Sequence, residues 1–255
     1  MKLTFRVPSL DQMLEATLWT QEDGITPYWR NDLYKAYPQI DQEKALALPE
    51  KERMKYVGDI LTQIYKEKKD ELKTLSKRWQ ERWNSQLEQI ERAFSQAYEI
   101  NAKSILNNMT AYVNLNFICP RYLDSHSCYL FYRIDPDQMV RICLHEVMHF
   151  FWFYKWQEHF HDDSKEYDTP HLKWIFSEMV QETMMQDTPI KDLAEWKGNT
   201  YDYFYTMNID GKPILKTLSD IHKQKGLIGL FKDGYQYCQE HENEIRAMIK
   251  EAENI

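Results

Sequence analysis

Apolar residues recur at two different spacings along this chain. Near the start, Leu3, Phe5 and Val7 alternate with other residues, which is the period of a short β-strand. Residues 9–48 show helical spacing only in short pieces interrupted by prolines. The first part of the chain therefore predicts one strand followed by short helices and turns.

The longest helical pattern begins at Pro49 and continues to about residue 101, with apolar side chains three and four residues apart. The charged run KEKKDELK at 66–73 interrupts this spacing. We expect an exposed turn in that run, and hence two antiparallel helices rather than a single rod. The predicted role of this region is that of a scaffold.

Two strands are predicted in the middle of the chain. Residues 110–120, TAYVNLNFICP, and 128–134, CYLFYRI, are rich in β-branched and aromatic side chains. The intervening PRYLDSHS suits a hairpin-type connection. We expect the strands at 1–7, 110–118 and 128–134 to form one small sheet.

Two helices with similar beginnings follow the strands. Asp135 is a good N-cap before Pro136, and QMVRICLHEVMHFFWFYKWQEHF comes next. Thr169 is likewise the predicted N-cap and Pro170 the first residue of the second helix, which continues with HLKWIFSEMVQETMMQD. Residues 217–252 predict one or two closing helices.

Composition and charge exclude several classes of protein. The net charge of −8 disfavours a phosphate-backbone partner, because nucleic-acid binders usually carry a basic patch. No apolar run is long enough to span a bilayer, and the first residues lack the apolar region of a signal peptide. We therefore expect a cytoplasmic protein that binds neither nucleic acid nor membrane. In that compartment the four widely spaced cysteines should be reduced and structural: Cys119, Cys128, Cys143 and Cys238.

An HExxH motif, His145-Glu146-Val147-Met148-His149, lies within the first of the two helices. Residues four apart on an α-helix are about 40° apart around the axis, so both imidazoles can reach one tetrahedral zinc ion. Glu146 lies beside them, where its carboxylate can reach a water on the metal without being a ligand. Such a motif can also arise by chance from ordinary core histidines. The strands before it and the carboxylate after it favour a metal site.

Glu178 is the best candidate for a third ligand. Glu178 and Glu182 are four residues apart, so they share a helix face. That face also carries side chains that should point inward: Trp174, Ile175 and Met185. A carboxylate facing an apolar core is unfavourable unless it meets a cation or strong donors. Zinc would satisfy Glu178, and the outer nitrogen of a zinc-bound histidine would satisfy Glu182.

Other candidates for the third ligand fit less well. A metzincin arrangement needs Gly and His at positions that are Trp152 and Lys155 here, so it is excluded. Four further residues at positions 159–171 carry ligand atoms: His159, His161, Asp162 and His171. The first two lie in the polar stretch HFHDD, which we interpret as an exposed loop. The alternative for Glu178 itself is an exposed acid paired with a lysine.

With these residues, the chain resembles the gluzincins, the thermolysin-like class of HExxH zinc metallopeptidases. The resemblance covers about residues 135–187. It implies three zinc ligands: His145, His149 and Glu178. It also implies that Glu146 is the general base and that Glu182 supports a ligand histidine.

Some positions depart from the gluzincin pattern. Ser177 stands where the family usually has Asn, and Glu182 where it usually has Asp. The 28 residues between His149 and Glu178 must hold a sizeable loop. The HExxH helix, with ICPR at 118–121 and the stretch 174–182, is also similar to an uncharacterised bacterial group of predicted metalloproteases.

An amide hydrolase also needs a donor for the oxyanion, and a tyrosine often supplies it. Three tyrosines in the irregular, Tyr-rich segment after the ligand helix are candidates: Tyr201, Tyr203 and Tyr205. With 17 tyrosines in the chain, each is more often a core or surface residue. Arg121 either holds a substrate carboxylate or is a structural residue at a strand end.

These features predict an α+β fold, mainly helical, with a small sheet packed on the HExxH helix as in zincins. We expect residues 1–255 to form a single zincin-like domain in three parts: a mainly helical scaffold at 1–108, strands and metal-binding helices at 109–187, and a helical C-terminal part at 188–255. Two lobes with the site between them are the alternative arrangement.

The favoured function is a zinc-dependent hydrolase, a metallopeptidase that acts on a peptide or protein substrate. The strand at 110–118 is a candidate edge for pairing with that substrate. The alternatives are a non-catalytic zinc-binding protein and a helical interaction protein. A structural zinc site has four protein ligands, whereas a catalytic site has three and an open position.

Overall fold

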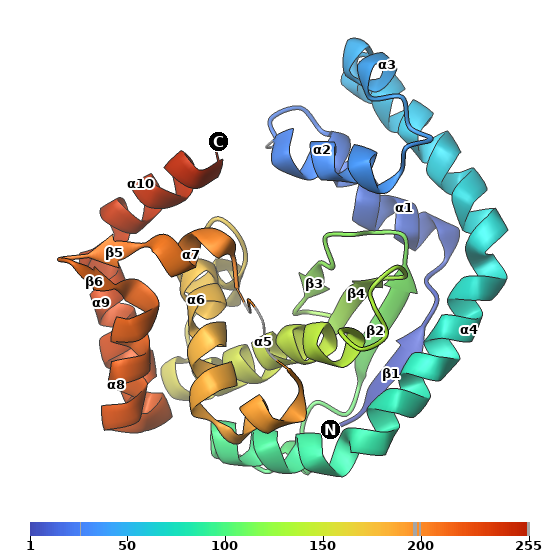
Figure 1. The fold of residues 1–255 in the computed structure, drawn as a ribbon. Helices are drawn as coiled ribbons and strands as arrows, with labels where there is room; N and C mark the ends of the chain where they lie inside the picture. Colours follow the sequence, from blue (N-terminus) through green and yellow to red (C-terminus); the bar gives the residue numbers. More distant parts are fainter. Residues whose placement is uncertain (26, 196–197, 199, 254–255) are drawn as a thin grey trace. The chain divides into compact units, whose positions relative to one another are not determined.

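The computed structural model describes all residues except 26, 196–197, 199 and 254–255. It is mainly helical and contains a four-stranded mixed sheet and a two-stranded sheet, which confirms the predicted α+β class (Figure 1). Among the described residues, no helix is both long enough and apolar enough to cross a membrane.

The chain divides into two compact units. The sheet unit contains Lys2–Ser85 and Asn107–Cys143. The helical unit contains Met1, Gln86–Leu106 and Leu144–Ile255. The predicted packing of the sheet on the HExxH helix, and the predicted single domain, stay predictions.

The sheet unit combines short helices with the four-stranded sheet. Its strands are β1 (Leu3–Arg6), β2 (Met109–Asn114), β3 (Arg121–Tyr122) and β4 (Ser127–Phe131). Its short helices are α1 (Leu10–Leu18), η1 (Trp19–Gln21), α2 (Pro27–Ala36) and α3 (Gln42–Ala47), as expected from the proline-interrupted pattern. The long helix α4 (Glu50–Tyr98) begins in this unit and ends in the helical unit, where η2 (Ala102–Ser104) follows it.

The sheet has the strand order β1-β2-β4-β3. All three predicted strands belong to it, and β1, β2 and β4 are parallel. The prediction of an edge strand at 110–118 is wrong, because β2 lies between β1 and β4 and its backbone pairs on both sides. The predicted hairpin between β2 and β4 is also wrong, since β3 forms the antiparallel pair with β4.

The outer edge of β1 is covered by a side chain from α4. The Phe5 N–H donates to Gln80 Oε1 at 2.9 Å, and Gln80 Nε2 donates to the Leu3 carbonyl at 3.1 Å. The amide of Gln80 therefore takes the place of a neighbouring strand and reduces the exposure of unpaired backbone groups at this edge.

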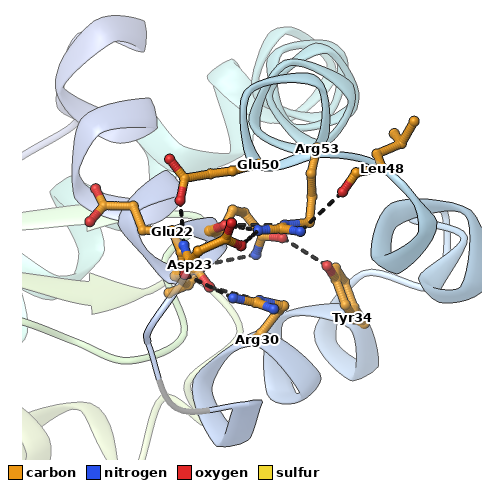
Figure 2. Close-up of polar contacts among 9 residues, drawn as sticks. Glu22, Asp23, Arg30, Tyr34, Leu48, Glu50 and Arg53 are labelled. Atoms are coloured by element: carbon orange, nitrogen blue, oxygen red, sulfur yellow. Dashed lines mark hydrogen bonds and ion pairs between the residues drawn. The ribbon is translucent and has the colours of Figure 1, made fainter.

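The short helices of the sheet unit are tied to α4 by Arg53, which is only 5% exposed. Its Nε and Nη2 donate to the Gln21 carbonyl, its Nη1 donates to the Leu48 carbonyl, and its Nη2 pairs with Asp23 Oδ1 at 2.5 Å. Figure 2 shows these contacts converging on the guanidinium. The buried charge is thus satisfied by carbonyl and carboxylate oxygens.

Helix α4 is continuous over 49 residues, so the predicted break at 66–73 is wrong. The run contains neither Gly nor Pro and is built of good helix formers. Its charges pair across helical turns, with Lys68–Glu71 at 2.8 Å and Asp70–Lys73 at 3.0 Å. The charged residues therefore support the helix that they were expected to interrupt.

The helical unit contains most of α5 and everything after it. Its helices are α5 (Met139–Phe160), η3 (Ser164–Tyr167), α6 (Leu172–Asp187), η4 (Pro189–Leu193), α7 (Asp202–Thr206), α8 (Ile214–Gly229), η5 (Leu230–Gly234), α9 (Tyr235–Glu240) and α10 (Glu242–Glu253). The strands β5 (Asn208–Ile209) and β6 (Lys212–Pro213) form the two-stranded sheet. The expected closing helices are confirmed.

The HExxH helix α5 and the helix α6, which carries Glu178, both begin slightly later than predicted. The Asp135 side chain accepts the Asp137 N–H at 2.8 Å and its carbonyl accepts the Gln138 N–H at 2.8 Å, so Asp135 closes a turn before α5 begins at Met139. The N-cap position of α6 is His171 rather than Thr169. The four cysteines form no disulfide bond, and burial raises the pKa of the Cys238 thiol.

Candidate metal centre

The two motif histidines lie on one face of α5, as their spacing requires. Their Nε2 atoms are 3.2 Å apart and their ring centroids 4.9 Å apart, with the ring planes at 75°. The side chain of His149 is completely buried, whereas that of His145 is 22% exposed. One imidazole therefore belongs to the interior and the other borders solvent.

Glu178 approaches both histidines from α6. Its Oε1 lies 3.3 Å from His149 Nε2, and its Oε2 lies 3.5 Å from His145 Nε2. The Glu178 side chain is 6% exposed, which excludes the alternative of an exposed surface acid. Among the described residues, His145, His149 and Glu178 are the one His/Cys/Asp/Glu group whose donor atoms could hold a metal ion.

The separations of these donors fit zinc. Zinc–nitrogen and zinc–oxygen bonds of about 2.0–2.2 Å at tetrahedral angles place neighbouring donors about 3.3–3.5 Å apart. The two Nε2 atoms are 3.2 Å apart, and each lies 3.3 or 3.5 Å from a different oxygen of the Glu178 carboxylate. Two imidazoles and one carboxylate are also a donor set that zinc commonly takes in catalytic sites. The three residues could therefore hold a metal ion, and its identity as zinc stays a prediction.

Aromatic packing holds α5 and α6 in place around the donors. Trp152, three residues after His149, packs edge-on against Phe176, two residues before Glu178, with ring centroids 5.6 Å apart. Phe231 packs against Trp152 at 4.5 Å. These rings are almost fully buried, so their contacts fix the distance between the ligand-bearing turns.

The end of α4 supports the motif helix from another direction. Tyr98 donates its hydroxyl to the Met148 carbonyl at 3.2 Å, and its ring packs against Phe151. Phe94 also contacts Phe151, with ring centroids 4.8 Å apart. Burial raises the pKa of Tyr98, so this hydroxyl stays a donor at any ordinary pH. The HExxH turn is therefore anchored within the helical unit.

Glu146, the predicted general base, is 8% exposed and lies on α5 directly after His145. Its place in the sequence directs its side chain about 100° around the helix from that of His145. The structure thus places a mostly buried carboxylate beside the more exposed of the two histidines, and its role as a general base stays a prediction.

Glu182, the predicted support for a ligand histidine, is half-buried on α6, one turn after Glu178. Its Oε2 accepts a hydrogen bond from the Tyr205 hydroxyl at 2.6 Å. The predicted hydrogen bond from a ligand histidine to Glu182 stays a prediction. The sequence singles out Tyr205 only as one of three candidate oxyanion donors and carries no signal for its contact with Glu182.

The competing ligand candidates do not join the donor group. Asp162 forms an ion pair with Lys173 at 2.7 Å and accepts from Trp156 Nε1 at 2.9 Å. Burial alone would raise the pKa of Asp162, but bonds from Lys173, Trp156 and Tyr167 lower it below its usual value. The other three candidates are exposed or half-buried: His159, His161 and His171.

Comparisons with known proteins found no relative of this chain. No family model, curated protein or solved structure matches the chain. The likeness to gluzincins therefore rests on the motif residues, and the geometry of the donor group is independent of it.

The remaining predicted site residues lie in different parts of the chain. Tyr201 and Tyr203 stack on each other, with ring centroids 5.2 Å apart and planes at 11°, and Tyr201 also meets Trp174 of α6. Arg121 is half-buried on β3 and belongs to the sheet unit. Its role toward a substrate carboxylate stays a prediction.

Proposed function

We propose that this chain is a zinc-dependent hydrolase that cleaves peptide bonds. The observation that carries the proposal is the group His145, His149 and Glu178, whose histidine Nε2 atoms are 3.2 Å apart and each 3.3–3.5 Å from one oxygen of the Glu178 carboxylate. Three protein donors leave one tetrahedral position for a reactant, which is typical of catalytic rather than structural zinc. The partial exposure of His145 is consistent with access from solvent on that side.

Zinc in such a position supplies a Lewis acid, which polarises a carbonyl oxygen and makes water more acidic. The chain's own contribution to the reaction is the movement of protons. The Glu146 carboxylate accepts a proton from the attacking water and then donates it to the nitrogen of the leaving amine. A base of this kind accounts for a factor of about 100 to 10,000 in rate.

The test is the substitution Glu146→Gln, which keeps the shape of the side chain and removes the base. Wild type and variant, both loaded with zinc, are incubated with a broad peptide library and the products are identified by mass spectrometry. We expect the variant to retain zinc and its melting temperature but to cleave at least about 100 times more slowly. Glu158→Gln is the matched control, because Glu158 is an exposed acid on the same helix.

Two results would contradict the proposal. The first is cleavage at the same rate by wild type and Glu146→Gln, or cleavage that a chelator does not stop. The second is the absence of any cleavage by zinc-loaded wild type across the library.

A further inference from the structure

A short segment of aromatic residues lies along the ligand-bearing face of α6. We call residues 201–205, with the sequence YDYFY, the tyrosine segment. The Tyr201 ring meets Trp174 at 6.1 Å, and the Tyr205 hydroxyl donates to Glu182 at 2.6 Å. Trp174 and Glu182 are each four residues from Glu178, so these contacts are made one turn before and one turn after the metal ligand.

The aromatic rings of the tyrosine segment are held in position by a buried ring of the same segment. Phe204 is fully buried, and its ring centroid lies 5.9 Å from that of Tyr201 and 4.6 Å from that of Tyr203. The stacked rings of Tyr201 and Tyr203 are half-buried, and Tyr205 is 40% exposed. Fixed aromatic faces that remain partly open to solvent can receive a ligand without first becoming ordered.

Among the described residues, two carboxylates lie within the segment or against it. Asp202 is an exposed acid within the segment, and Glu182 places a carboxylate at its end. The nearest cation along α6 is Lys173, whose amino group pairs with Asp162 and Glu166. The chain as a whole carries a net charge of −8. A positively charged group would therefore be attracted here, and an acidic group repelled.

We propose that the tyrosine segment binds a basic side chain, Lys or Arg, of a peptide substrate close to the bond that is cleaved. This inference rests on the proposed peptidase function. The faces of Tyr201 and Tyr203 attract a cation through their ring quadrupoles, and the guanidinium of Arg also stacks on such rings. The carboxylates of Asp202 and Glu182 add negative charge that attracts the positively charged side chain.

The experiment compares cleavage of peptides that differ at one residue. A peptide that zinc-loaded wild type cleaves is made with Arg, Leu or Glu at each position next to the cleaved bond, and kcat/KM is measured for each. We expect Arg to be preferred at one of these positions, Glu to be the poorest, and the preference for Arg over Leu to weaken as salt is added.

Variants of the segment separate recognition from folding. Tyr203→Leu should reduce the Arg-over-Leu ratio about two- to fivefold, which is the range for a partly exposed cation–π contact, while Tyr203→Phe should keep it. Asp202→Asn should lower the same ratio and its salt dependence. The control is Tyr154→Leu, an exposed tyrosine on α5, for which the ratio should not change.

The outcomes distinguish this inference from the proposed function. Cleavage that favours Leu, or an Arg preference that Tyr203→Leu and Asp202→Asn leave unchanged, would overturn the subsite and leave the peptidase intact. Absence of cleavage of every peptide by zinc-loaded wild type would overturn the peptidase, and the substrate assignment with it.

Discussion

Zinc should stabilise the folded chain, and the loss of one ligand should abolish that effect. The three ligand residues come from α5 and α6, and only folding brings their donor atoms within 4.8 Å of one another. The unfolded chain does not hold them together, so zinc binds the folded state in preference. The perturbation is the removal of one donor by Glu178→Gln or His149→Ala.

The size of the effect follows from linkage. A ligand present at 100 times its Kd stabilises the folded state by about 2.7 kcal/mol. An unfolding entropy of about 2.1 cal/mol/K per residue corresponds to about 0.5 kcal/mol/K for 255 residues. Zinc should therefore raise the melting temperature of wild type by about 5 °C.

The assay is scanning calorimetry of metal-stripped protein before and after zinc is added. Glu178→Gln is nearly isosteric and tests the ligand without creating a cavity, whereas His149→Ala removes a fully buried ring and lowers the starting temperature as well. For both variants, the increase on adding zinc should be much smaller than for wild type. His161→Ala, at an exposed histidine, is the control and should respond as wild type does.

One result would refute the reasoning directly. If zinc raised the melting temperatures of wild type, Glu178→Gln and His149→Ala equally, the ion would bind elsewhere. An unchanged melting temperature of wild type at saturating zinc would show that the donor group does not bind zinc.

Three further predictions concern the rest of the helical unit. Asp187→Asn should lower stability by about 1–2 kcal/mol in thermal unfolding, because the Asp187 carboxylate is 8% exposed and pairs with Lys223 at 2.9 Å; Asp220→Asn, at a more exposed ion pair, should change little. Burial lowers the pKa of His222 below 6.5, so the folded state loses stability as pH falls below that value, and His222→Gln should flatten the decline in melting temperature between about pH 7 and 5. Trp152→Ala should cost about 3–5 kcal/mol in denaturant unfolding, because a fully buried ring is lost.

The donor group was predictable because each part of its signal is local. His145 and His149 are brought together by helical spacing alone, and a helix was clear from the apolar pattern around them. Glu178 required one further step, the argument that a carboxylate on an inward face needs a cation. Its 6% exposure agrees with that argument.

The wrong predictions concern segments whose local pattern fits two structures, or strands whose pairing partner is far away in the sequence. The run at 66–73 has the charge of a loop but the composition and pairing of a helix, and in the absence of Gly or Pro the helix continues. The position of β2 inside the sheet depends on β1, more than 100 residues earlier, which no local pattern encodes. The contact of Tyr205 with Glu182 is likewise a product of tertiary packing.

The donor group is positioned by side chains that have no part in metal chemistry. Trp152, Phe176 and Phe231 set the spacing between α5 and α6, and Tyr98 anchors the turn that carries His149. A site formed in this way needs no metal to fold, unlike a zinc finger, whose small core is insufficient without the ion. Chelation should therefore leave the far-ultraviolet circular dichroism of the chain unchanged while it stops hydrolysis. Loss of helical signal on chelation would mean that zinc holds α5 and α6 together, and would favour a structural role for the ion.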